Sequence, residues 1–223
     1  MQVTSIHMQG VTMKTRLLLI LSLLILSPLA SADRDAIAPS ADTVTPLLNG
    51  MRVPDVTVKT VDGDPVSLRA IVMQKPTLIL FYRGGWCPYC NRQLAGIKNI
   101  EADLTKLGYQ ILAISPQSGE QLKEQALKTE MDAMLYTDNS LSAITQFGIA
   151  FHLDSMTAAK YKTYGISLTK DASGTPVLPA PALFFVNTKG EIQFNYVNPD
   201  YKARPSEALV LEVAKVLASE KGG

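Results

Sequence analysis

The chain has 223 residues, of which 47% are hydrophobic and 18% are charged, and its formal net charge is +1. This composition provides enough apolar material for one buried core, and the length fits one domain with an additional segment. The near-neutral charge excludes the strongly basic surface that binds nucleic acid, so we expect no nucleic-acid partner.

The first 32 residues have the organisation of a secretory signal peptide. Lys14 and Arg16 precede the apolar run LLLILSLLIL (17–26), which is followed by the small-x-small sequence Ala30-Ser31-Ala32. The apolar run is shorter than the roughly 20 residues that a membrane-spanning helix needs. We therefore expect cleavage after Ala32 and a periplasmic or secreted chain that has no membrane segment.

The remaining boundaries follow from this interpretation. The residues before Met13 are interpreted as an upstream extension, so that translation would begin at Met13. Residues 33–46 contain two prolines and are predicted to form a flexible leader. The folded domain is expected over residues 47–220.

Within the domain, apolar runs of strand length alternate with segments of helical spacing, which predicts an α/β fold. Residues 148–175 show no clear period, apart from a possible helix over 156–164. In chain order we predict a strand at 56–60, a strand at 77–82, a helix at 88–107, a strand at 110–115, a helix at 119–130, a strand at 134–136, a helix at 141–147, strands at 182–186 and 191–196, and a helix at 205–219. A βαβ unit followed by a hairpin and a terminal helix indicates a thioredoxin-like fold, in which helices flank a central mixed sheet.

Both cysteines of the chain lie in Cys87-Pro88-Tyr89-Cys90. Haem attachment requires a histidine directly after the second cysteine, where this chain has Asn91. A structural zinc site requires four ligands. Besides carboxylates, the mature chain offers only these two thiols and His152, so we expect no metal. A purely structural disulfide across so short a loop stabilises little, which favours a redox-active pair.

The position of the pair strengthens the redox interpretation, because it follows a predicted buried strand and opens a predicted helix. Cys87 would be the N-cap, Pro88 would take the first helical position, and Cys90 would lie one turn away. The positive end of the helix dipole favours a thiolate at Cys87. We therefore predict that Cys87 attacks and that Cys90 resolves the product as an intramolecular disulfide.

Two stretches carry a resemblance to a known family. FYRGGWCPYCNRQL (81–94) and LPAPALFFVNTKGEIQFNYVNPDYKAR (178–204) resemble peroxiredoxin-like proteins of the AhpC/TSA group in the thioredoxin superfamily. The resemblance extends over residues 47–217. It implies a thiol-dependent oxidoreductase that reduces a peroxide or a disulfide and is recharged by an external dithiol donor, without a cofactor.

The resemblance also assigns positions. It places Pro181 as a cis proline facing the cysteines. Aligned with the peroxiredoxin signature Pro-x-x-x-Thr-x-x-Cys, Cys90 falls on the peroxidatic cysteine, Cys87 on the threonine and Arg83 on the proline. Aligned with thioredoxins, Cys87 is the attacking thiol. Both alignments remain open at this point.

Two neighbours of the pair are candidates for shaping the site. Trp86 resembles the aromatic residue that precedes the cysteines in thioredoxins, and it would shape a partner surface or pack on the sheet. Arg83 would stabilise the thiolate or bind a peroxide oxygen, or else be a solvated surface charge. Two alternative functions accompany the peroxidase hypothesis: a thiol–disulfide reductase of proteins without peroxidase activity, and a non-catalytic binding domain fastened by a structural disulfide.

Overall fold

The computed structural model describes residues 34–129 and 135–220, and the predicted signal segment therefore lies outside the described residues. Within those two ranges, no helix is long and apolar enough to cross a membrane.

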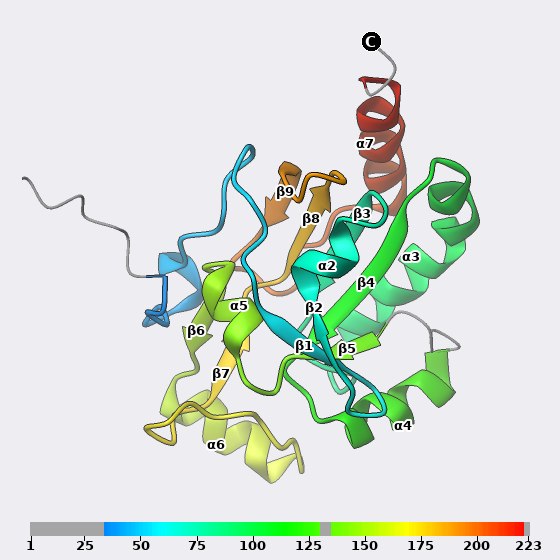
Figure 1. The fold of residues 1–223 in the computed structure, drawn as a ribbon. Coiled ribbons are helices and arrows are strands. Elements are labelled where there is room, and N and C mark those ends of the chain that lie inside the picture. The colour runs from blue at the N-terminus through cyan, green and yellow to red at the C-terminus, as the bar shows by residue number, and fades with distance from the viewer. Residues whose placement is uncertain (1–33, 130–134, 221–223) are drawn as a thin grey trace, which may run out of the picture. The chain divides into compact units, whose positions relative to one another are not determined.

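A mixed sheet forms the centre of the domain (Figure 1). In spatial order, the seven strands found in the described residues are β2 (Pro65–Ser67), β1 (Thr57–Thr60), β5 (Leu135–Thr137), β4 (Gln110–Ser115), β3 (Thr77–Phe81), β8 (Ala182–Val186) and β9 (Ile192–Val197). β3 and β5 run parallel to β4, whereas β8 runs antiparallel to β3. The predicted α/β fold with a central mixed sheet is confirmed.

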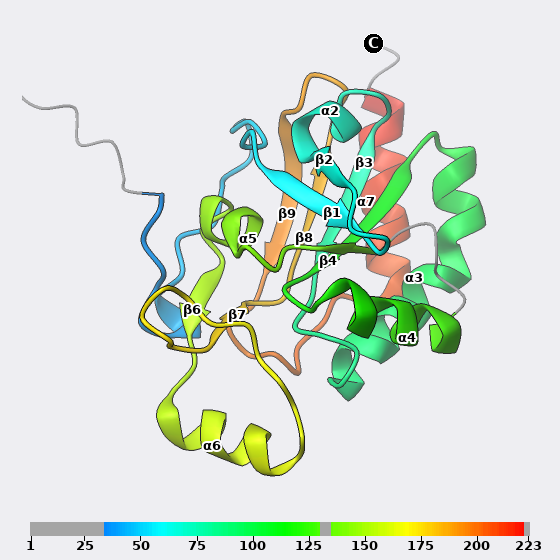
Figure 2. The same cartoon turned by 60° about the horizontal axis from the view of Figure 1, so that its bottom comes forward.

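The central strand β3 contributes to both faces of the sheet. Ile79 and Phe81 belong to one apolar cluster, and Leu78 and Leu80 belong to another, because successive side chains of a strand point to opposite faces. The elements that cover the first face are α2 (Leu68–Val72) and α5 (Ser142–Gln146), and those that cover the second are α3 (Pro88–Lys106), α4 (Gly119–Thr129) and α7 (Glu207–Ser219). Figures 1 and 2 show α3 and α7 side by side on this second face.

A smaller sheet lies outside the central one. It consists of β6 (Ala150–His152) and β7 (Val177–Pro179), which are antiparallel and are joined through α6 (Ser155–Thr163). Figure 2 shows α6 set apart from the central sheet, with β6 and β7 between them. The prediction of a helix near 156–164 is confirmed, whereas both short strands were not predicted.

The segment before the domain differs from the flexible leader that we expected. The backbone N–H of Ala38 donates to the Ala150 carbonyl at 3.0 Å, and the N–H of His152 donates to the Ala38 carbonyl at 2.9 Å. A short 3-10 helix, η1 (Ala41–Thr43), follows. Ala38 thus pairs with the edge of β6, and Ala38, Ala41 and Val44 pack against the apolar cluster that contains Phe151.

Candidate active site

The beginning of α3 places the two cysteines one turn apart. Cys87 is the N-cap with extended backbone angles, and Pro88 occupies the first helical position. The Cys87 carbonyl accepts the first helical hydrogen bond, from the Asn91 N–H at 3.1 Å. Both cysteines are free thiols and both are buried. The predicted placement of the pair at a helix start is confirmed.

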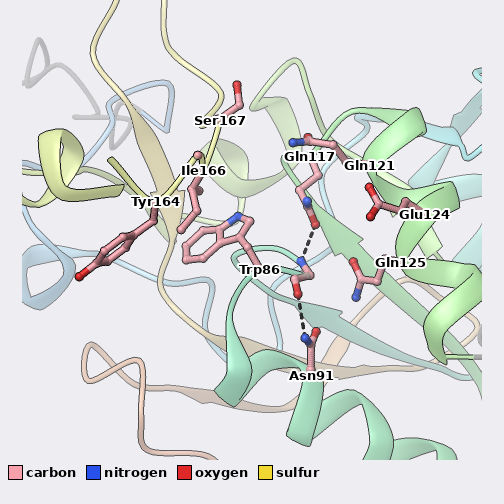
Figure 3. A pocket seen from close by; sticks show the side chains of 11 residues that line it. Trp86, Asn91, Gln117, Gln121, Glu124, Gln125, Tyr164, Ile166 and Ser167 are labelled. Carbon is pink, nitrogen blue, oxygen red and sulfur yellow. Dashed lines mark hydrogen bonds between the residues drawn. The ribbon is translucent and has the colours of Figure 1, made fainter. Parts of the chain in front are cut away.

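Two glycines allow the loop before Cys87 to approach its neighbours closely. Gly84 has φ +149°, and a Cβ atom there would lie 2.4 Å from Nε1 of Trp86. The N–H of Gly85 donates to Oε1 of Gln117 at 2.6 Å, and Nδ2 of Asn91 donates to the Gly85 carbonyl at 2.7 Å (Figure 3). The loop is thus fixed from β4's end on one side and from α3 on the other.

Cys90 contacts an arginine from a distant part of the chain. Nη2 of Arg204 lies 3.4 Å from the Cys90 Sγ, while Nη1 donates to Gln93 and Nε donates to the Tyr201 carbonyl. Arg204 lies between β9 and α7, and 114 residues separate it from Cys90. It ends the second stretch that carried the family resemblance, but sequence reasoning gave it no role.

The two thiols have opposite electrostatic environments. The pKa of Cys90 is lowered to about 6, chiefly because the Cys87 thiol donates a hydrogen bond to its sulfur, and further by the charge of Arg204 and the Arg83 backbone N–H; burial opposes this shift. The pKa of Cys87 is raised above its ordinary value, because its proton is held by Cys90 and because the thiol is buried. Within the pair, these interactions favour the thiolate form of Cys90 over that of Cys87.

The prediction that the helix start lowers the pKa of Cys87 is wrong in this structure. Cys90 also lies in the first turn of α3, so the helix dipole by itself does not favour one sulfur over the other. The hydrogen bond between the sulfurs and the charge of Arg204 decide the difference. Of the two residues that act on Cys90, Cys87 lies within the local motif, whereas Arg204 lies 114 residues away.

Arg83 is buried, with 3% of its surface exposed, rather than solvated. Its Nη2 donates to the hydroxyl of Tyr161 at 2.9 Å. The guanidinium carbon lies 4.4 Å from the ring centre of Tyr201 and 5.2 Å from that of Trp86, within the range of cation–π attraction. Its charge favours the thiolate form of Cys87, although this effect is smaller than those that raise the Cys87 pKa.

A cavity of about 570 Å³ lies between the start of α3, α6 and the loop after β9. Cys87, Arg83, Trp86 and Pro181 all line it. Trp86 also lines a smaller, polar cavity of about 290 Å³ that Gln117 and Gln121 line as well; Figure 3 shows its indole beside Ile166, with the two glutamines on the other side. The structure thus brings four of the five predicted site residues together around one space, whose lining does not include Cys90, and Trp86 lies between two cavities.

The expected cis proline is absent from the described residues. All their peptide bonds are trans, including the one that precedes Pro181. The N–H of Ala180 donates to the Ile149 carbonyl at 2.8 Å, and the chain then continues directly from β7 into β8. Pro181 is therefore part of the cavity wall, but its predicted cis conformation is wrong.

A thioredoxin-like sheet with a buried dithiol at the start of its central helix defines a class of proteins, the thiol oxidoreductases. The sequence profile of the AhpC/TSA family matches residues 50–195. The chain therefore belongs to the AhpC/TSA family and is a peroxiredoxin-like thiol oxidoreductase, as the resemblance implied.

Individual relatives agree with this assignment. Peroxiredoxin Bcp of Escherichia coli is 28% identical over 131 residues, which cover 59% of this chain and 83% of Bcp. The fold is similar to that of reduced Prx3 from Vibrio vulnificus (TM-score 0.62, 13% identity, 75% of this chain and 99% of Prx3). It is also similar to peroxidoxin BcpB from Mycobacterium tuberculosis (TM-score 0.59, 15% identity, 77% of this chain and 96% of BcpB).

Proposed function

We propose that the protein is an extracytoplasmic thiol peroxidase in which Cys90 attacks the peroxide and Cys87 resolves the product. The contacts of Cys90 carry this proposal. Its sulfur accepts a hydrogen bond from the Cys87 thiol and lies 3.4 Å from the guanidinium of Arg204. Both interactions favour the thiolate, which is the form that reacts with peroxides.

The proposed reaction has two steps. The Cys90 thiolate attacks one peroxide oxygen, the O–O bond breaks, and the leaving alkoxide or hydroxide takes up a proton, so that Cys90 becomes a sulfenic acid. The Cys87 thiol then attacks the Cys90 sulfur, which forms the Cys87–Cys90 disulfide and releases water. An external dithiol donor returns the pair to the reduced state with two electrons.

The relatives support a peroxide as the substrate. The name peroxiredoxin belongs to Bcp of Escherichia coli, and the Prx3 structure from Vibrio vulnificus is a complex of the reduced protein with hydrogen peroxide. Cys90 falls on the peroxidatic cysteine of the family signature, and the low pKa of this thiol agrees with that alignment.

Mass spectrometry of two single variants, treated with hydrogen peroxide and a sulfenic acid trap, tests the assignment. We expect trapped sulfenic acid on Cys90 in Cys87→Ser, and no comparable product on Cys87 in Cys90→Ser. Serine at position 87 still offers a hydroxyl donor, which makes it a better substitute than alanine. Sulfenic acid on Cys87 alone would reverse the two roles and return the assignment to the thioredoxin alignment.

A second candidate is thiol–disulfide exchange with protein substrates through Cys87. One observation favours it, since Cys87 lines the 570 Å³ cavity and Cys90 is not among the residues that do so. The two functions separate kinetically: a reduced protein whose thiols react with hydrogen peroxide no faster than free cysteine, yet reduce a protein disulfide, would be an exchange enzyme.

The extracytoplasmic location is proposed from residues 1–32 alone. Cell fractionation and N-terminal sequencing test it. We expect a mature chain that begins at Asp33 and is recovered outside the cytoplasm; a cytoplasmic chain that retains LLLILSLLIL would contradict the proposed location.

A further inference from the structure

Arg83 has hydrogen-bonding capacity that the protein does not use. A guanidinium has five N–H donors. Only Nη2 of Arg83 has a recorded acceptor, the hydroxyl of Tyr161, while Nε and Nη1 are buried without a partner among the described residues. No ion pair joins Arg83 to a carboxylate that the structure describes. Buried charges are normally paired, so these donors indicate a missing anionic partner.

The groups around the cavity favour an anion as that partner. Arg83, Lys160 and Asp154 are the charged residues in its lining. The Asp154 carboxylate is already engaged as the N-cap of α6, where Oδ1 accepts the Thr157 N–H at 2.8 Å. Two positive charges and one negative charge thus line the space, and the negative one, Asp154, is held at the start of α6 by its cap hydrogen bond.

The rest of the lining fits an organic molecule of limited size. Six of the 18 lining residues are aromatic and four are prolines, and the volume of about 570 Å³ lies within the range of small-molecule sites. Such walls bind an apolar body while one or a few polar groups fix its orientation. The cavity is therefore suited to a small organic molecule that carries one negative group for Arg83.

The position of Cys87 determines what such a molecule would meet. Cys87 is the cysteine in the cavity lining, and the charge of Arg83 acts on its sulfur. In the oxidised state of the proposed cycle, a nucleophile arriving through the cavity would attack Cys87 and expel Cys90. Expulsion of Cys90 is the favourable direction, since the Arg204 guanidinium 3.4 Å from its sulfur stabilises the leaving thiolate.

We propose that the cavity binds the reductant of the Cys87–Cys90 disulfide, and that this reductant is a small organic thiol whose carboxylate binds Arg83. The proposal deepens the function given above and rests on the formation of that disulfide. It replaces the general dithiol donor expected from the sequence with a molecule of defined chemistry.

The reduction balances as two thiol–disulfide exchanges. The donor thiolate attacks the Cys87 Sγ, which forms a mixed disulfide and breaks the Cys87–Cys90 bond, and the electron pair leaves on Cys90 as a thiolate. A second donor thiolate attacks the donor sulfur of the mixed disulfide. This releases the donor disulfide, and Cys87 takes up a proton. Two donor thiols are oxidised, and the protein gains two electrons.

The direct test compares a carboxylate-bearing thiol with a neutral one. Oxidised protein is mixed with 3-mercaptopropionate or 2-mercaptoethanol at equal thiolate concentration, and reduction is followed by the fluorescence of Trp86, the single tryptophan. We expect the carboxylate to react roughly tenfold or more faster, because a hydrogen bond between charged groups exceeds a neutral one. Equal rates would overturn the proposal.

Three variants test whether Arg83 causes the difference between the two reduction rates. Arg83→Met should bring the ratio of the two rates to about one, and Arg83→Lys should retain part of the selectivity because it keeps the charge. Arg92→Met is the matched control, since Arg92 lies next to Tyr89 on α3 but does not line this cavity. The ratio within each variant is independent of the amount of folded protein. A ratio unchanged by Arg83→Met would overturn the proposal.

Binding without chemistry separates this proposal from the proposed function. The double variant Cys87→Ser, Cys90→Ser is titrated with 3-phenylpropionate and with 3-phenylpropanol while Trp86 fluorescence is followed. We expect the carboxylate to bind more tightly and Arg83→Met to remove that preference, even if Cys90 forms no sulfenic acid. Equal binding of the two probes would overturn the anion site.

The oxidising substrate is the other source of a carboxylate. Peroxide turnover is therefore measured with a fatty acid hydroperoxide and with its methyl ester, in wild type and in Arg83→Met. We expect Arg83→Met to leave the ratio of these two rates unchanged. A carboxylate preference that depends on Arg83 in this reaction, and is absent from disulfide reduction, would assign the site to the peroxide and overturn the reductant proposal.

Discussion

The surroundings of Cys87 and Cys90 differ far more than their spacing suggests. Cys87 lies at the helix cap and lines the 570 Å³ cavity, and the charge of Arg83 acts to lower its pKa. Cys90 lies one turn further, faces the core and contacts Arg204 from the other end of the domain. The motif fixes the proximity of the two thiols and the hydrogen bond between them, and the distant Arg204 adds a charge that favours ionisation of Cys90.

Exchange of either cysteine for serine should have the largest effect, and the two exchanges should change peroxide consumption in different ways. Cys90→Ser should lower the rate of peroxide consumption on the order of a thousandfold or more, because it removes the nucleophile. Cys87→Ser should still consume about one peroxide per chain and then stop, since no resolving thiol remains. Stopped-flow peroxide consumption measures both results. A Cys90→Ser protein with a full first turnover would contradict the assigned roles.

The two arginines offer a finer comparison. Arg204→Met should raise the pKa of Cys90 by about one unit, since it removes an adjacent opposite charge. At a pH equal to the wild-type pKa of Cys90, the thiolate fraction would fall from about one half to about one tenth, which slows the first reaction with peroxide roughly fivefold.

Arg83→Met is the matched control for that experiment. Arg83 lowers the Cys90 pKa through its backbone N–H, which side-chain exchange retains, so Arg83→Met should shift the pH profile of the first reaction less than Arg204→Met does. Arg204→Lys should recover part of the effect, because it restores the charge. Equal shifts for Arg83→Met and Arg204→Met would show that general positive charge, rather than the contact at Cys90, sets the pKa.

The loop before the cysteines provides the smallest expected effect. Gly84→Ala should lower the free energy of unfolding by roughly 1–3 kcal/mol, because φ +149° is strained for alanine and its Cβ would meet Trp86. Gly63 also has a positive φ of +98°, but a Cβ there would contact nothing within 4 Å. Gly63→Ala should therefore cost less. Urea unfolding followed by Trp86 fluorescence measures both free energies. Equal decreases for the two variants would show that contact with Trp86 does not add to the cost at Gly84.

Strong local patterns made much of the fold predictable. The strands at 110–115 and 182–186 were predicted with their observed bounds, and the helix at 88–107 differs from α3 by one residue at its end. These are long or continuously apolar segments, for which periodicity is informative. In contrast, α7 begins at Glu207 rather than Pro205, because Ser206 caps it by accepting the Leu209 N–H.

The elements that were not predicted are short and depend on distant partners. β6 and β7 have three residues each and form only by pairing with one another across α6. β2 and α2 are similarly brief. Segments of this length have too few positions to show a period, so the chain that packs on them determines their structure.

In the candidate site too, local features were predictable from the sequence, whereas contacts between distant residues were not. The position of Cys87 and Cys90 at a helix start followed from the order of strand, cysteine, proline and helix. The contact with Arg204 did not, because 114 residues of chain separate it from Cys90. The burial of Arg83 was missed for a similar reason, since its partner Tyr161 lies 78 residues away.

The most direct test of the account is the ultraviolet absorbance of thiolate, titrated against pH in the two single serine variants. We predict that Cys90, which keeps its contact with Arg204 in Cys87→Ser, ionises at a lower pH there than Cys87 does in Cys90→Ser. Below its pKa each thiol is in the protonated, unreactive form, and above its pKa it is the thiolate. A lower pKa for the thiol of Cys90→Ser than for the thiol of Cys87→Ser would contradict the assignment of Cys90 as the attacking residue.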